Sequence, residues 1–214
     1  MKFESKKNSD SMSTPLNLEF PDKGSTQITP DTFLSRIGNG KYQNRALFIV
    51  GLLVVNDGAE VLVLSFLLSI LQKEWNLTNS EIGLMGSTNF IGFLIGSIIS
   101  GRISDKLGRR KPLLYVFFLL YFFAMWSAFA ESFFTLLVVR TAFRFFEAFR
   151  YNLVITYLTE ISPKESRGMI LYLSGAFWIV GELFASFATF FTLDSADQGN
   201  WRLLLIIVAQ PAFF

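Results

Sequence analysis

From residue 44 onward the chain alternates long apolar segments with short polar ones. A membrane-spanning helix needs roughly 20 apolar residues, because each residue adds about 1.5 Å along the helix axis and the hydrocarbon core is about 30 Å thick. The segments that follow this pattern are Ala46–Ile70, Ile82–Ser100, Pro112–Ala130, Ser132–Leu158, Met169–Thr192 and Trp201–Phe214. The pattern predicts an all-α integral membrane protein with six transmembrane helices. We expect the sixth helix to be incomplete and the sequence to be a fragment or a truncated product, because the last segment stops after residue 214.

The first part of the chain, residues 1–43, is polar and shows no sustained periodicity. We interpret it as a mostly disordered tail that precedes a helical bundle over residues 44–214. One short juxtamembrane helix is predicted within the tail. Thr29 followed by Pro30 favours a helix start, and Gly38 favours a stop. The apolar face of this helix would lie along the membrane surface. The alternative is that the segment is an apolar loop and not a helix.

The composition supports a membrane protein and narrows its chemistry. Hydrophobic residues make up 51% of the chain and aromatic residues 16%, which is too apolar for a soluble domain of 214 residues. The net charge of +2 does not indicate nucleic-acid binding, which typically goes with a strongly basic domain. The chain has no cysteine and no histidine, so proton-linked chemistry near neutral pH would depend on carboxylates. We find no phosphate-binding loop, metal-ligand cluster or nucleophile–base pair, and we predict no enzyme activity, no cofactor and no metal site.

Cations in the short loops predict the orientation of the chain. The loop between the second and third segments carries Arg102, Lys106, Arg109, Arg110 and Lys111, and the loop between the fourth and fifth carries Lys164 and Arg167. The opposite side has Lys73 and Arg202. Because basic loops stay in the cytoplasm, the N-terminus is predicted to be cytoplasmic. The sequon Asn76-Leu77-Thr78 then lies on the other side, close to the membrane, with modification as the less favoured reading.

Ionisable residues inside the apolar segments are the strongest indication of function. They are Asp57, Glu60, Arg140, Arg144, Glu147, Arg150 and Glu182. A lone charge at the bilayer centre costs at least about 2.5–3.5 kcal/mol, so residues of this kind face a protein interior and pair with one another. Counting residues from the segment ends places Asp57 and Arg140 at the same depth, which predicts that they pair.

The spacing of the charges on the fourth segment predicts one polar stripe. Arg140, Arg144, Glu147 and Tyr151 follow one another at helical intervals and therefore share a face. We predict a solute- or ion-binding site formed by Asp57, Glu60, Arg140, Arg144, Glu147 and Glu182. The alternative is that the charges are permanently paired structural struts.

Small residues on the second and fifth segments predict close helix packing. Gly92, Gly96 and Ser100 recur every four residues, and Gly181 and Ala185 repeat the spacing. Without side-chain bulk another helix can approach closely in lipid. We assign these residues to packing and not to ligand binding.

Two loops resemble a known family. Gly101–Lys111 has the order Gly-Arg-Ile-Ser-Asp-Lys-Leu-Gly-Arg-Arg-Lys, which resembles the signature loop between helices two and three of the major facilitator superfamily. Glu160-Ile-Ser-Pro-Lys-Glu-Ser-Arg167-Gly168 resembles the motif after helix four in the sugar-porter and organic-ion branches, and Arg140 falls where those branches carry an arginine. The stretches 37–43 and 71–78 are most similar to the synaptic-vesicle-type and organic-ion-transporter-like group.

The resemblance implies the N-terminal half of a twelve-helix transporter that works by alternating access on a small organic or ionic solute. The Asp57–Arg140 pair resembles a coupling pair in proton-linked sugar porters, which implies proton coupling. A C-terminal half or a partner chain would complete the bundle in the lipid bilayer of the plasma membrane or an intracellular vesicle. It further implies a charge network at the cytoplasmic face that holds one conformation, here called the conformational lock. Its residues would be Gly101, Asp105, Gly108, Arg109, Arg110, Glu160 and Arg167.

The fourth segment departs from the family pattern. Arg144, Phe146 and Ala148 stand where such transporters usually carry glycines after the helix-four arginine. Arg144 adds a cation, which favours an anionic solute, although Glu147 one turn later could neutralise it. The departure and the short sixth segment leave a second hypothesis open, in which the chain is a transporter-derived scaffold or subunit that moves no solute.

Overall fold

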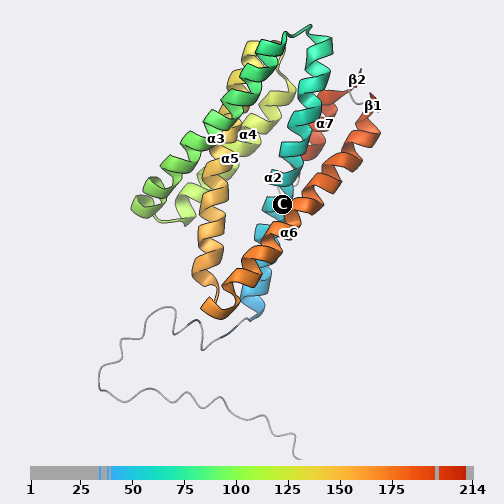
Figure 1. Ribbon diagram of the computed structural model, residues 1–214. Helices are drawn as coiled ribbons and strands as arrows, with labels where there is room; N and C mark the ends of the chain where they lie inside the picture. The colour runs from blue at the N-terminus through green and yellow to red at the C-terminus, as the bar shows by residue number, and fades with distance from the viewer. Residues whose placement is uncertain (1–33, 35–37, 39, 196–197, 211–214) are drawn as a thin grey trace, which may run out of the picture.

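The computed structural model describes residue 34, residue 38, residues 40–195 and residues 198–210. Over this part the chain forms the helices α2 (Lys41–Glu74), α3 (Asn79–Leu107), α4 (Arg110–Ala128), α5 (Phe133–Ile161), α6 (Lys164–Thr192) and α7 (Trp201–Ala209) (Figure 1). Two short strands, β1 (Leu193–Ser195) and β2 (Gln198–Gly199), pair antiparallel between α6 and α7. The structure confirms the all-α class and the six helices, while the small β-ribbon was not predicted.

Four of these helices are long and apolar enough to cross a membrane: α2, α3, α4 and α6. The 29 residues of α5 include five charged ones, Arg140, Arg144, Glu147, Arg150 and Glu160, and α7 is described over only nine residues. The helices extend past the apolar segments that predicted them. For example, α2 begins at Lys41, before Ala46, and ends at Glu74, after Ile70. The reason is that a hydropathy pattern marks the hydrocarbon core, whereas a helix continues into the polar interface.

Local hydrogen bonds explain where several helices begin and end. The hydroxyl of Thr78 accepts from the backbone N–H of Glu81 at 3.3 Å, and the Glu81 carboxylate accepts from the Thr78 backbone at 2.8 Å, a capping box that starts α3. Ser132 caps α5 in the same way through the N–H of Thr135. The predicted tail helix lies almost wholly outside the described residues. Within it, the N–H of Gly38 donates to the carbonyl of Leu34, and Gly38 has a φ of 70°, which fits the predicted stop.

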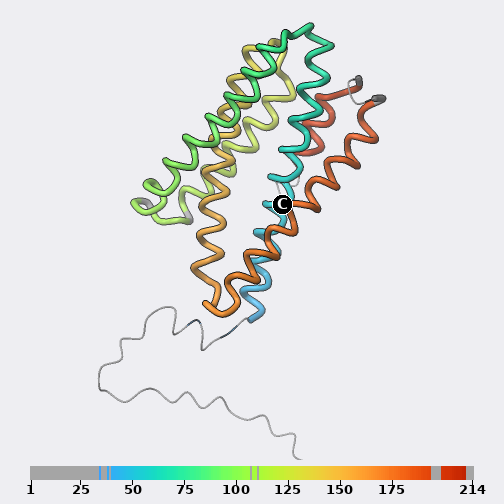
Figure 2. The backbone as a smooth tube through the Cα atoms, viewed as in Figure 1, coloured from blue at the N-terminus to red at the C-terminus, as the bar shows by residue number. Residues whose placement is uncertain are grey.

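The helices pack mainly as two pairs, α3 with α5 and α2 with α6. Glycine permits both close approaches. A Cβ on Gly96 would overlap with the carbonyl oxygen of Phe145, and one on Gly181 would overlap with the carbonyl oxygen of Val55. The packing role predicted for these small residues is confirmed. Figures 1 and 2 show α4 beside the first pair and α7 beside the second.

We call the end that holds the α2–α3, α4–α5 and α6–α7 connections the outer end, and the opposite end the inner end. At the outer end Trp75 and Trp201 stack edge to face with ring centroids 5.9 Å apart, and the Trp201 indole N–H donates to Glu74 at 2.6 Å.

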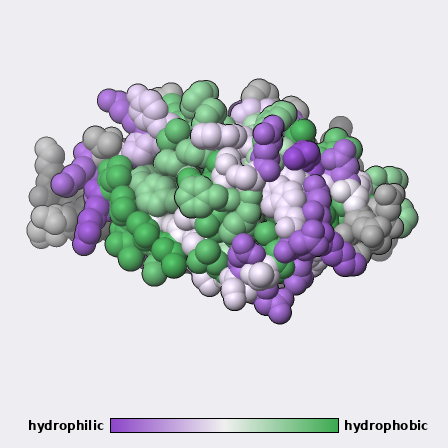
Figure 3. Space-filling model, turned by 90° about the horizontal axis from the view of Figure 1, so that it is seen from above, coloured by the Kyte–Doolittle hydropathy of each residue, from purple (hydrophilic) through white to green (hydrophobic). Residues whose placement is uncertain are grey.

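On the surface of the bundle, large apolar side chains such as Phe90 and Phe190 are exposed, and Figure 3 shows apolar side chains over much of one face. Exposed apolar surface on this scale is expected for a protein surrounded by lipid.

Candidate functional site

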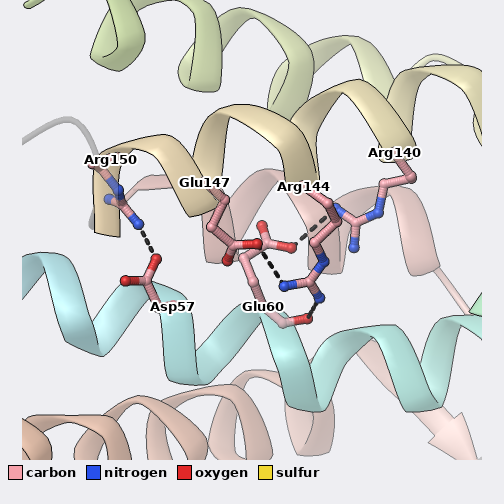
Figure 4. A network of polar contacts seen from close by, with 6 residues as sticks. All are labelled: Asp57, Glu60, Arg140, Arg144, Glu147 and Arg150. Atoms are coloured by element: carbon pink, nitrogen blue, oxygen red, sulfur yellow. Dashed lines mark hydrogen bonds and ion pairs between the residues drawn. The ribbon is translucent and has the colours of Figure 1, made fainter. Parts of the chain in front are cut away.

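Six ionisable side chains meet between α2 and α5 in the middle of the bundle (Figure 4). We call them the interior charge network: Asp57 and Glu60 from α2, and Arg140, Arg144, Glu147 and Arg150 from α5. Every one of them is buried, with exposed fractions from 0% for Arg140 to 5% for Arg144. Three carboxylates face three guanidinium groups, so the network is formally neutral, as expected where unpaired charge would be very costly.

The network joins α2 to α5 at three points. Arg140 donates through Nη1 to Oε2 of Glu60 at 2.9 Å. Arg144 donates through Nη2 to the backbone carbonyl of Glu60 at 3.1 Å and through Nη1 to Oε2 of Glu147 at 2.6 Å. Arg150 forms an ion pair with Asp57. Glu60 is therefore the centre of the network, because it accepts from two arginines that lie one turn apart.

The predicted pairing of Asp57 with Arg140 is wrong. Asp57 pairs with Arg150, and Arg140 pairs with Glu60. The two helices run in opposite directions, so the later carboxylate of α2 meets the earlier arginine of α5. Depth counted from the ends of apolar segments carries an error of about one helical turn, or 5.4 Å, which is enough to choose the wrong partner.

Arg150 is the residue that the predicted binding set left out. It was counted among the charges of the fourth segment, but it lies off the helical stripe of Arg140, Arg144 and Glu147. Its long side chain reaches Asp57 on one side and lies over the ring of Phe117 on α4, 5.8 Å from the ring centroid. The signal that could have found it is the charge count, because the predicted set had only two cations, Arg140 and Arg144, for more than two carboxylates.

Glu182 was predicted in the same site, but the structure does not bring it there. It lies on α6 and is half-buried. Its carboxylate accepts from the indole N–H of Trp178, one turn earlier on the same helix, at 2.9 Å. The five other predicted site residues do come together.

The network has more donors than acceptors left over. Nε and Nη2 of Arg140 and Nε and Nη1 of Arg150 lack a hydrogen-bond partner, as does Oε1 of Glu147. Asn56, next to Asp57, leaves its Oδ1 without a partner. A buried polar atom without a partner costs about 1–3 kcal/mol, so these groups favour contact with a polar molecule. Within the described residues no cluster of His, Cys, Asp or Glu could hold a metal ion.

A second charge cluster lies at the inner end, and it contains much of the predicted lock. Arg109, which precedes the first turn of α4, forms an ion pair of 2.6 Å with Glu160 near the end of α5. Arg109 also lines a small cavity of about 230 Å³, together with Gly101 and Asp105 of α3. The structure thus brings Gly101, Asp105, Arg109 and Glu160 to one place, which we call the inner-face cluster.

The remaining predicted lock residues have other surroundings. Gly108 ends α3 with a φ of 74°, a backbone conformation that favours glycine. Arg167 donates through Nη2 to the carbonyl of Ser162 at 3.3 Å, across the turn between α5 and α6. The side chain of Arg110 lies outside the described residues.

A family model described as Major Facilitator Superfamily matches residues 47–214, which is more than half of the chain. The chain belongs to the major facilitator superfamily. It is 29% identical over 194 residues to synaptic vesicle glycoprotein 2A of Homo sapiens, a match that covers 86% of this chain and 26% of the relative. Synaptic vesicle glycoprotein 2B of Mus musculus is 29% identical over 192 residues, covering 85% and 28%.

The fold also resembles a solved structure, the xylose transporter XylE from E. coli in an inward open conformation. The TM-score is 0.69 at 21% identity, and the match covers 80% of this chain and 46% of XylE. The chain therefore spans about a quarter of the length of the relatives named above and about half of the structural neighbour. Together with the helices of spanning length, these findings identify a multi-pass membrane protein with the fold of the N-terminal half of this family.

Proposed function

We propose that this chain is the N-terminal half of a transporter that moves a small organic or ionic solute across a membrane by alternating access. The observation that carries the proposal is the interior charge network, because buried ionisable residues between membrane helices typically mark a substrate or ion path. Transporters of this kind bind their solute near the bilayer midplane, between two repeated halves. A C-terminal half or a partner chain would supply the other wall of the path.

The network favours a solute rich in hydrogen-bond acceptors. The unpartnered atoms of Arg140 and Arg150 are donors, and guanidinium groups bind carboxylates and phosphates through parallel hydrogen bonds. The solute would compete with Glu60 and Asp57 for these donors. Protonation of either carboxylate would release its arginine for the solute, which is a simple route to proton coupling in a chain without histidine.

The relatives support this assignment and its location. XylE is a xylose transporter, and the synaptic vesicle glycoproteins are named for a vesicle membrane. We place this chain in a vesicle membrane or the plasma membrane, with its N-terminus in the cytoplasm. The cations of the α3–α4 loop support that orientation. No step of the proposed cycle makes or breaks a covalent bond, so we assign transport and not catalysis.

The inner-face cluster would hold the inward side closed for part of the cycle. Arg109 and Glu160 are 29% and 51% exposed, so solvent can reach the ion pair. Exposed pairs are weak, and a weak contact opens and closes readily. Gly101 has no atom within 4 Å of an added Cβ, which leaves room for a helix of another half to pack there.

The transport assignment can be tested with the protein and its natural C-terminal partner in liposomes. Uptake is measured for radiolabelled xylose, choline and glutamate, which represent a neutral sugar, an organic cation and a carboxylate. We expect Glu60→Gln to abolish uptake of the transported probe. Glu131→Gln, at an exposed position between α4 and α5, is the matched control and should transport normally. Unchanged uptake by Glu60→Gln would remove the network from the transport path.

The second candidate is a non-transporting scaffold or subunit of a membrane assembly. The observation in its favour is that each carboxylate of the network already has an arginine partner, as expected of structural struts. It predicts a stable complex with a partner that covers α2 and α5, and no uptake of any probe. Full transport by the protein without such a partner would exclude it.

A further inference from the structure

Glu182 is a charged residue in the middle of a membrane helix, and the interior charge network does not include it. It lies on α6, about 27 Å from the inner end of the helix and about 15 Å from its outer end at 1.5 Å per residue. Among the described residues no arginine or lysine forms an ion pair with it. Its carboxylate accepts from Nε1 of Trp178 at 2.9 Å. A charge at this depth is costly without a counter-charge, so Glu182 calls for a cationic partner.

Helix contacts place Glu182 at the level of the interior charge network. The preceding residue, Gly181, packs against the backbone of α2 at Val55 and Ala59. Asp57 lies between these two residues in the sequence, so Glu182 and Asp57 are at about the same depth in the bundle. In Figure 1, α2 stands between α6 and α5, and the arginines of the network are bound to their own carboxylates between α2 and α5. The network therefore leaves the charge of Glu182 uncompensated.

Helix geometry also shows which way Glu182 points. Successive residues of an α-helix are about 100° apart around its axis, and Gly181 faces α2. Phe184 packs against the core cluster that contains the first turns of α7. Glu182, two residues earlier, lies about 200° away around the helix and therefore faces away from α7. It is half-buried, and the next residue, Leu183, is 65% exposed, so the carboxylate lies at the edge of the α2–α6 contact beside a surface that a ligand can reach.

Trp178 places an aromatic ring beside this carboxylate. The ring packs against the core cluster that contains Val50 and Val54 of α2, and the backbone carbonyl of Trp178 lies against Gly58. The indole N–H is held by Glu182, one turn later on the same helix. The ring and the carboxylate are therefore fixed next to each other before a ligand arrives. A carboxylate beside the ring of a tryptophan combines the two groups that attract an ammonium cation, a negative charge and an aromatic face.

We propose that Glu182 and Trp178 bind the positively charged nitrogen of a small organic solute, a protonated amine or a quaternary ammonium. A hard metal ion fits less well, because it needs several oxygen ligands and within the described residues no cluster of His, Cys, Asp or Glu could hold one. The role of this site in transport rests on the proposed function. To that function it adds a class of solute, one that carries a cationic nitrogen besides the acceptor groups favoured by the network.

Equilibrium binding of radiolabelled choline and ethanolamine to the 214-residue chain in nanodiscs tests the site without requiring transport. Glu182→Gln removes the charge and keeps an oxygen that can accept from Trp178. The dissociation constant of both probes should therefore rise by about tenfold or more. Glu165→Gln makes the same change at an exposed position in the first turn of α6 and is the matched control, with an unchanged dissociation constant.

Two variants of Trp178 test the ring separately and give an independent readout if Glu182→Gln does not fold. Trp178→Phe keeps an aromatic face and should weaken binding by about threefold, whereas Trp178→Leu removes the face and should weaken it by about tenfold.

The proposal is overturned if neither probe binds saturably to the native chain, or if Trp178→Phe and Trp178→Leu bind as tightly as the native chain. Equal weakening by Glu182→Gln and Glu165→Gln would also overturn it, because that result would indicate a general effect of charge. Saturable binding that depends on Glu182, without uptake in the liposome assay, would remove the proposed transport and retain the site.

Discussion

The interior charge network and the inner-face cluster use the same chemistry in different surroundings. In both, an arginine pairs with a glutamate on another helix, at 2.9 Å for Arg140 and Glu60 and at 2.6 Å for Arg109 and Glu160. The interior side chains are 0% and 1% exposed, and the inner-face side chains are 29% and 51% exposed. Loss of one partner of a buried pair costs about 3–5 kcal/mol, whereas exposed pairs contribute about 0–1 kcal/mol. Burial, and not distance, separates a pair that holds helices together from one that contributes little to stability.

The largest effect is expected for Glu60→Leu. This change leaves Arg140 buried with no carboxylate, so the free energy of unfolding should fall by about 3–5 kcal/mol. Denaturation by sodium dodecyl sulfate, followed by circular dichroism, measures the loss. The double variant Glu60→Leu/Arg140→Met removes both charges and should regain most of the stability. If the double variant is as unstable as the single one, charge imbalance is not the cause.

A smaller effect is expected for Asp57→Asn. The amide oxygen can still accept from Arg150, but the charge-assisted part of the interaction is lost, so the free energy of unfolding should fall by about 1.5–3 kcal/mol. The same denaturation experiment applies. Asp105→Asn makes the identical change at an exposed position on α3 and should have almost no effect. Similar losses for the two variants would contradict the contrast between buried and exposed charges.

The smallest effect is expected for Arg109→Ala. This variant should lose about 1 kcal/mol or less, because its ion pair with Glu160 is partly solvated. In 1 M salt the loss should vanish, since the Debye length falls to about 3 Å. Arg102→Ala removes another exposed arginine, in the last turns of α3, and is the control. A loss that matches Asp57→Asn, or that resists salt, would show that the inner-face pair is structural.

Much of the architecture followed from the sequence because its causes are local. Apolar segments of spanning length marked the helices, and glycines four residues apart marked a close helix contact, confirmed at Gly96 and Gly181. The loop motifs predicted that Arg109 and Glu160 lie in one charge cluster, and the structure pairs them. Both residues lie at the inner ends of helices, and the order of the helices along the chain determines at which end of the bundle each loop lies.

The partners inside the bundle could not be predicted in the same way. Which arginine meets Asp57 depends on the register between α2 and α5, and register is set by packing along the whole length of both helices. Glu182 was misplaced for a related reason, since the periodicity of α6 alone does not show that Trp178 would hold its carboxylate away from the network. The β-ribbon between α6 and α7 could not be predicted, because its short strands show no alternation of apolar and polar residues.

The separation of the paired charges along the chain has a consequence for biosynthesis. Glu60 is synthesised 80 residues before its partner Arg140, and Asp57 is synthesised 93 residues before its partner Arg150. At a synthesis rate of roughly 5–20 residues per second, α2 exists for roughly 4–19 s before its basic partners emerge from the ribosome. During this interval both carboxylates need water, a proton or the insertion machinery to satisfy them. Among the described helices, α2 is therefore the one whose membrane integration depends most on timing.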